Sequence, residues 1–144
     1  MTNTTTTTSL DLNGSFYAGF RKKLRAGAPV YGPEEQAAIQ ETVGELLAVS
    51  TASQPGMLLG KIQSGKTKTF LGIMALAFDN GFDIAVVLTK PTTALAKQTF
   101  KRISKDFADF IDADEVKVYD ILELPHRLTQ FELNQKLVFV VKKQ

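Results

Sequence analysis

The sequence has no cysteine, one histidine and no long apolar run, and each absence removes a class of protein. Without cysteine there is no disulfide framework, no thiolate metal site and no cysteine nucleophile. His126 cannot build a zinc site by itself. The most apolar stretch, residues 70–78, is less than half of the roughly 20 residues that a membrane-spanning helix needs. The first residues also lack the basic start and apolar stretch of a secretory signal, so we expect a soluble cytoplasmic protein with no membrane partner.

Charge is small in total but unevenly distributed. The net charge is +2, and residues 1–105 carry 12 of the 17 lysines and arginines but 7 of the 15 acids. An anion-binding surface is therefore expected in the first part of the chain, although a basic cluster can also be an ordinary solvated face. The length of 144 residues and the ordinary apolar fraction of 44% predict a single compact core.

The sequence up to residue 49 predicts a lead and two helices. Residues 1–14 are a threonine-rich stretch that we expect to be mobile, with the folded domain covering residues 15–144. Ser15 is placed to cap a short helix with an apolar stripe, and Pro33 with two following acids is typical of a second helix start. The expected core residues are Phe16, Phe20 and Leu24 in the first helix, and Ile39, Val43, Leu46 and Leu47 in the second, which extends to about residue 49.

The rest of the chain alternates between strand and helix patterns. The helix at 65–78 is expected to place Phe70, Ile73, Met74 and Ala77 on one side, and the run 84–88 has the character of a strand buried on both faces. Leu95, Ile103 and Phe107 mark a further helix that ends near residue 110. This order predicts an α/β fold with a parallel sheet, whose strands are expected at 57–59, 84–88, 116–119 and 137–141.

Residues 60–67 read Gly-Lys-Ile-Gln-Ser-Gly-Lys-Thr and fit the Walker A pattern of a phosphate-binding loop. Glycines at 60 and 65 allow a tight turn whose backbone N–H groups face an anion at the start of the next helix. Lys66 would reach the β- and γ-phosphates of ATP, and the Thr67 hydroxyl would bind Mg²⁺. The alternative is a glycine-rich turn that happens to precede a lysine. The predicted nucleotide-binding residues of this segment are Gly60, Lys61, Gln63, Ser64, Gly65, Lys66, Thr67 and Lys68.

A second pattern, Lys-Pro-Thr-Thr-Ala-Leu-Ala-Lys-Gln, covers residues 90–98. Taken alone, Pro91 and Thr92 start and cap a helix. Taken with the Walker loop, the segment resembles motif Ia of the DEAD/DEAH-box helicases and related superfamily-two translocases, and a bacterial subgroup related to restriction enzymes is the most similar. The resemblance extends over about residues 30–141.

The resemblance implies a P-loop NTPase domain of the RecA-like type, with ATP and Mg²⁺ as cofactors and Lys66 as the catalytic residue. Residues 33–39 are similar to the segment that reads the adenine edge in this family, which makes Gln36 the base-recognition candidate; the alternative is a surface glutamine on an amphipathic helix. Pro91, Thr92, Thr93 and Gln98 would hold a DNA or RNA backbone.

Hydrolysis in this family also needs a strand ending in Asp-Glu and arginines from a second, similar domain. Residues 112–115, Asp-Ala-Asp-Glu, are the nearest match, but they follow a predicted helix rather than a strand. His126 is interpreted as a loop residue rather than a catalytic base. We therefore expect a chain truncated before its catalytic acid, whose missing partners are the rest of its own domain and a second RecA-like domain.

Three functions remain open from the sequence. The first is the ATP-binding front part of an ATP-dependent helicase or translocase, inactive in hydrolysis by itself. The second is a standalone module that binds ATP or ADP without hydrolysing it. The third, a small-molecule phosphotransferase, is disfavoured because the chain has no arginine-rich lid.

Overall fold

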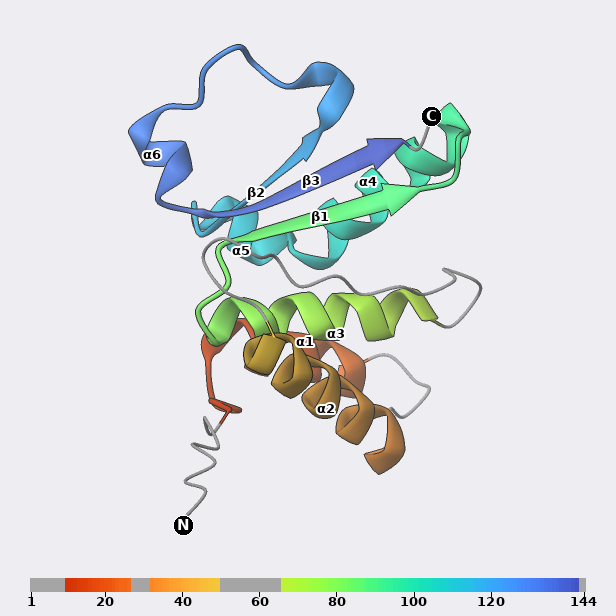
Figure 1. Ribbon diagram of the computed structural model, residues 1–144, viewed down its shortest axis with the longest axis vertical. Coiled ribbons are helices and arrows are strands. Elements are labelled where there is room, and N and C mark those ends of the chain that lie inside the picture. The colour runs from red at the N-terminus through yellow and green to blue at the C-terminus, as the bar shows by residue number, and fades with distance from the viewer. Residues whose placement is uncertain (1–9, 27–31, 50–65, 143–144) are drawn as a thin grey trace. The chain divides into compact units, whose positions relative to one another are not determined.

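The structure is a computed structural model that describes residues 10–26, 32–49 and 66–142. The chain divides into two compact units, Met1–Asn80 and Gly81–Gln144. The described part of the first unit consists of α1 (Ser15–Ala26), α2 (Pro33–Val49) and α3 (Lys66–Asp79), and the second unit contains the sheet (Figure 1). The predicted strand at 57–59 lies outside the described residues.

Helix α3 is the centre of the first unit, because α1 and α2 both pack against it. All residues from Leu71 to Phe78 are buried, so the buried surface of α3 extends beyond the side on which Phe70, Ile73, Met74 and Ala77 were predicted. Ile39 and Val43 of α2 are fully buried as predicted, whereas Leu46, Leu47 and Phe70 are only half-buried. In α1, Tyr17 is fully buried, although it was not among the predicted core residues.

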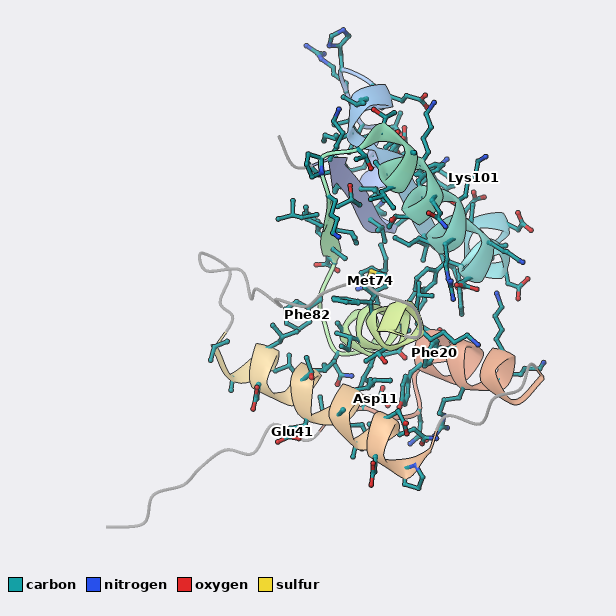
Figure 2. The ribbon with its side chains drawn as sticks, turned by 90° about the vertical axis from the view of Figure 1, so that its right-hand side faces the viewer. Asp11, Phe20, Glu41, Met74, Phe82 and Lys101 are labelled. Carbon is teal, nitrogen blue, oxygen red and sulfur yellow. The ribbon has the colours of Figure 1, made fainter. Side chains whose placement is uncertain are left out.

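Helices α1 and α2 both approach α3 closely at Gly72. A Cβ atom at this position would lie 2.6 Å from Cε1 of Phe20 in α1 and 2.7 Å from Cδ1 of Ile39 in α2. Figure 2 shows Phe20 at the contact between α1 and α3. Glycine at this position therefore allows the three helices to pack at this distance.

The start of α1 is capped by the end of α3. The carboxylate of Asp79 accepts hydrogen bonds from the backbone N–H groups of Phe16 (3.1 Å) and Tyr17 (2.8 Å), the role predicted for Ser15. Asn80 binds the residues that precede α1, because its Oδ1 accepts a hydrogen bond from the backbone N–H of Asp11 at 2.7 Å. The chain from Asp11 onward thus belongs to the folded unit, although the sequence placed it in the lead.

The second unit is a three-stranded parallel sheet in the order β1-β3-β2. The central strand pairs with both others, so that Val86, Phe139 and Tyr119 lie side by side across the sheet. No helix in the described ranges is long and apolar enough to cross a membrane. The elements in chain order are β1 (Ile84–Thr89), α4 (Thr93–Asp106), α5 (Ala108–Asp112), β2 (Val116–Asp120), the 3₁₀ helix η1 (Ile121–Glu123), α6 (Gln130–Leu133) and β3 (Lys136–Lys142).

One face of the sheet packs against α4, which contacts all three strands (Figure 1). Val138 and Val140 of the central strand are buried. Among the described strands, β1 lies at one edge of the sheet, and Ile84, Val86 and Leu88 are exposed on 57–60% of their surface. The prediction that this strand is buried on both faces is therefore wrong, because its residues alternate between a covered and an exposed side.

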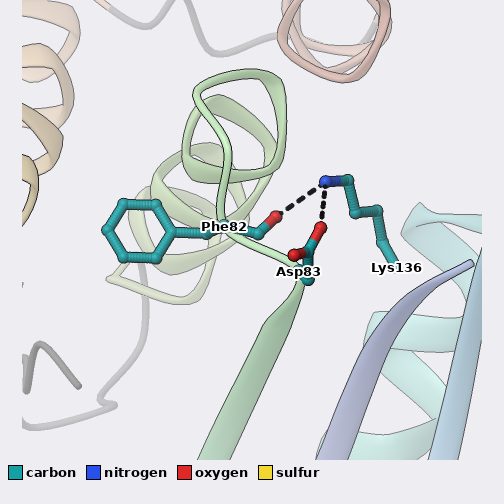
Figure 3. A network of polar contacts seen from close by, with 3 residues as sticks. All are labelled: Phe82, Asp83 and Lys136. Carbon is teal, nitrogen blue, oxygen red and sulfur yellow. Dashed lines mark hydrogen bonds and ion pairs between the residues drawn. The ribbon is translucent and has the colours of Figure 1, made fainter. Parts of the chain in front are cut away.

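The amino ends of β1 and β3 are tied together by Lys136 (Figure 3). Its ammonium donates to the carbonyl oxygen of Phe82 and to Oδ1 of Asp83, both at 2.9 Å. The carboxylate of Asp83 is mostly exposed, so we expect this ion pair to contribute only modestly to stability. Its clearest role is to fix the register of β3 against β1.

Candidate nucleotide and nucleic-acid site

The phosphate-loop residues enter the described structure at the start of α3. Lys66 and Thr67 are the first two residues of this 14-residue helix, and Lys68 follows as a half-buried residue. The first turn of α3 contains no acidic residue. Because N–H groups at a helix start are unpaired within the helix and carry partial positive charge, this start has the electrostatics of an anion site. The remaining predicted loop residues, Gly60, Lys61, Gln63, Ser64 and Gly65, lie outside the described residues.

Gln36, the predicted adenine-reading residue, lies in the first turn of α2, in the same unit as Lys66. Its backbone N–H donates to the carbonyl oxygen of Gly32 at 3.2 Å, and its residue is half-buried. This bond fixes the start of α2 at Pro33, as predicted.

The carboxyl ends of the three strands lie at one edge of the sheet, because the strands are parallel. Ligands of open α/β sheets bind at this edge. Strand β1 leads there into Lys90 and Pro91, and β2 ends there at Asp120. The Asp120 carboxylate accepts a hydrogen bond from the N–H of Leu122 at 3.0 Å. The turn that follows β2 therefore accounts for an aspartate at this position.

The start of α4 brings three of the predicted nucleic-acid residues together. Thr92 is the N-cap, and its hydroxyl oxygen accepts from the N–H of Leu95 at 3.4 Å, which leaves the hydroxyl hydrogen to donate. Pro91 and Thr93 flank it, and all three are exposed. Gln98 is exposed as well, but five residues of helix place it about 140° around α4 from Thr93. It therefore faces a different direction from the other three.

The described residues offer no carboxylate pair in the position that hydrolysis needs. Residues 112–115 connect α5 to the amino end of β2, the edge opposite to the strand ends, and Asp114 takes a left-handed conformation with φ of 58°. No group of three or more potential metal ligands occurs among residues 10–26, 32–49 and 66–142. His126 is an exposed residue of a loop, the position that the sequence predicted.

The shifted pKa values in the described structure belong to a structural pair. The Tyr119 hydroxyl donates to a carboxylate oxygen of Glu132, whose other oxygen takes part in a capping box with Thr129. Burial, and then the bond to Glu132, raises the pKa of Tyr119 to about 12, and the same bond lowers the pKa of Glu132. Perturbed groups often mark active sites, but here they attach α6 to the sheet.

One feature of this region was missed by sequence reasoning. Helix α4 carries three exposed lysines that follow Thr93 at intervals of four residues, namely Lys97, Lys101 and Lys105. The available signal was the spacing itself, which the count of charges over residues 1–105 does not reveal.

The second unit is thus an α/β unit with a three-stranded parallel sheet, compatible with a Rossmann-like or RecA-like arrangement. What can be said of function comes from the chain's own residues and their geometry. Comparison with protein-family models, curated proteins and solved structures finds no match to this chain.

Proposed function

We propose that this chain is the ATP-binding front part of an ATP-dependent DNA or RNA helicase or translocase. The observation that carries the proposal is the start of α3 at Lys66, directly after the glycine-bounded loop. A phosphate loop needs this register, because its lysine and hydroxyl residue must open the helix whose N–H groups face the phosphates. The absence of acids in the first turn of α3 agrees with an anionic ligand.

In this proposal each residue has a separate role. The backbone of residues 60–65 surrounds the phosphates, Lys66 places its ammonium on them, and Gln36 reads the adenine edge. Thr67 would hold Mg²⁺ through its hydroxyl oxygen, a hard ligand of the kind this ion prefers, with phosphate and water oxygens as further ligands. Mg²⁺, when bound, neutralises phosphate charge.

The nucleic-acid part of the proposal is supported by the start of α4. Thr92 and Thr93 are exposed at the carboxyl edge of a parallel sheet and offer two hydroxyl donors and the backbone N–H of Thr93, whereas the N–H of Thr92 donates to the carbonyl oxygen of Lys90 at 2.8 Å. Such donors bind phosphate oxygens without reading the base sequence. We expect this contact to position a strand rather than to select it.

The alternative is a standalone nucleotide-binding module that does not hydrolyse ATP. It is favoured by the position of residues 112–115, because no described strand ends in an Asp-Glu pair. The two functions differ in oligonucleotide binding. A helicase front part should bind a single-stranded oligonucleotide and lose affinity in the Thr92→Ala/Thr93→Ala variant, whereas the module should show no such binding.

Isothermal titration with Mg-ATP tests the nucleotide site. One lost charge-assisted contact is worth about 1.5–3 kcal/mol, so Lys66→Ala should weaken binding by roughly 10- to 150-fold. Thr67→Ala should mainly remove the dependence on Mg²⁺. Lys22→Ala, at an exposed position of α1, is the control and should bind Mg-ATP like the wild type. Equal affinities for wild type and Lys66→Ala would contradict the proposal.

A further inference from the structure

Thr93, Lys97, Lys101 and Lys105 form a row along α4. Four residues of helix turn the chain by about 400°, so each member is offset by about 40° from the one before it, and the row winds about 120° around α4 between Thr93 and Lys105. All four residues are exposed, and Figure 2 shows Lys101 extending from the outer side of α4. We call these four residues the lysine row.

The positive charge of the lysine row is not neutralised locally. Helix α4 contains one acid, Asp106, which pairs with Arg102 at 3.9 Å. Within the described ranges, none of the three lysines forms an ion pair with an acidic residue. Three ammonium groups thus face solvent over two turns of one helix, a charge pattern that attracts a polyanion.

The opposite side of α4 is committed to the protein core. Ala96 and Ile103 are 5% and 2% exposed, and the helix packs against the sheet. Membrane-surface helices bind by burying their apolar face in lipid, and α4 has no such face to offer. The exposed lysines therefore favour a polyanion that is bound by charge alone.

We propose that the lysine row is a track for the sugar-phosphate backbone of a single nucleic-acid strand. The inference rests on the proposed function and extends it, since it gives the strand a path from Thr93 at the sheet edge to the far end of α4. The row is about 18 Å long at 1.5 Å per residue, long enough to contact several successive phosphates of one strand. Lysine ammonium groups are point charges that bind phosphates without sequence selection.

Fluorescence anisotropy with a labelled oligothymidylate, over a range of KCl concentrations, tests the track. Each neutralised phosphate of a single strand contributes about 0.7 to the salt slope. The Lys97→Gln/Lys101→Gln/Lys105→Gln variant should lower that slope by about 2, and its affinity at 0.1 M KCl should fall by about 100-fold. Lys101→Gln alone should lower the slope by about 0.7. The control, Lys22→Gln/Lys23→Gln/Arg127→Gln, removes the same charge from exposed positions elsewhere and should keep the slope.

The outcomes separate this inference from the proposed function. If the triple lysine variant keeps the wild-type slope while Thr92→Ala/Thr93→Ala weakens binding, the track is wrong and the contact at the start of α4 stands. Binding of phosphatidylserine vesicles, but not of the oligonucleotide, through the same lysines would overturn the track in favour of a membrane surface. Equal loss with duplex and single-stranded probes would overturn the single-strand assignment. ATP titration of each variant should stay at the wild-type affinity, because no residue of the lysine row belongs to the phosphate loop.

Discussion

At the scale of single residues, Tyr119 and Glu132 connect pH to stability. Glu132 accepts from the Tyr119 hydroxyl and from Thr129, which lowers its pKa, so the carboxylate favours the folded state above its ordinary pKa. The contribution of the Glu132 carboxylate to stability is lost as the pH falls through its lowered pKa. The pKa of Tyr119 is raised from 10.0 to about 12, so its contribution is complete below pH 10 and is lost between pH 10 and pH 12.

The Glu132→Gln variant tests this coupling. It should remove the acid-side part of the pH dependence, measured as the free energy of unfolding in urea at several pH values. The tyrosinate absorbance of Tyr119 should then appear at lower pH than in the wild type, although still above the ordinary value, because burial is the first cause of the shift. Tyr119→Phe identifies the signal among the three tyrosines. An unchanged high-pH titration in Glu132→Gln would show that the bond is absent in solution.

Asp79 is the second residue with a measurable role, because its carboxylate caps α1 from the end of α3. Loss of a helix N-cap costs about 0.5–2 kcal/mol, and a carboxylate at a helix start also interacts favourably with the helix dipole. We expect Asp79→Ala to lower the free energy of unfolding by about 1–2 kcal/mol in urea titrations. Asp112→Asn, at an exposed position, is the control. Equal effects of the two changes would contradict the capping role.

At the scale of elements, alanine is expected to have opposite effects on stability at Gly44 of α2 and at Gly72 of α3. Alanine is favoured over glycine within a helix by about 1 kcal/mol. Gly44→Ala should realise that gain, since its Cβ would meet only Leu10 at 3.9 Å. Gly72→Ala should instead destabilise by about 1–3 kcal/mol, because its Cβ would overlap Phe20 and Ile39. Thermal unfolding of both variants measures the difference, and stabilisation by Gly72→Ala would show that the helices can separate at little cost.

Local signals predicted most elements but not their surroundings. Pro33 with its two acids set the start of α2, and β-branched runs located β1, β2 and β3 within one or two residues. The cap of α1 was not predictable, because Asp79 lies more than sixty residues away in sequence. The exposed side of β1 was missed for a related reason, since an apolar run does not show whether its strand lies at the edge of a sheet.

The candidate site was predictable to the extent that its chemistry is local. The Gly-Lys-Thr sequence at 65–67 indicated where α3 begins, and Pro91 with Thr92 indicated where α4 begins. Gln98 was grouped with these threonines because it is close in sequence, but the helical turn directs it elsewhere. The lysine row required knowledge of which side of α4 is buried, which depends on packing against the sheet.

At the scale of the whole molecule, the proposed chemistry separates binding from turnover. Phosphate binding needs only the loop and the start of α3, whereas hydrolysis needs a group that positions the attacking water and cations that stabilise the transition state. No described strand ends in an acidic pair, and residues 112–115 lie at the amino end of β2. We therefore expect the chain to bind Mg-ATP but to release phosphate at the background rate, with or without an oligonucleotide. A phosphate-release assay checks this with Lys66→Ala as the control: activity that persists in the variant comes from a contaminant, and activity that the variant abolishes would show that the chain holds a complete catalytic site.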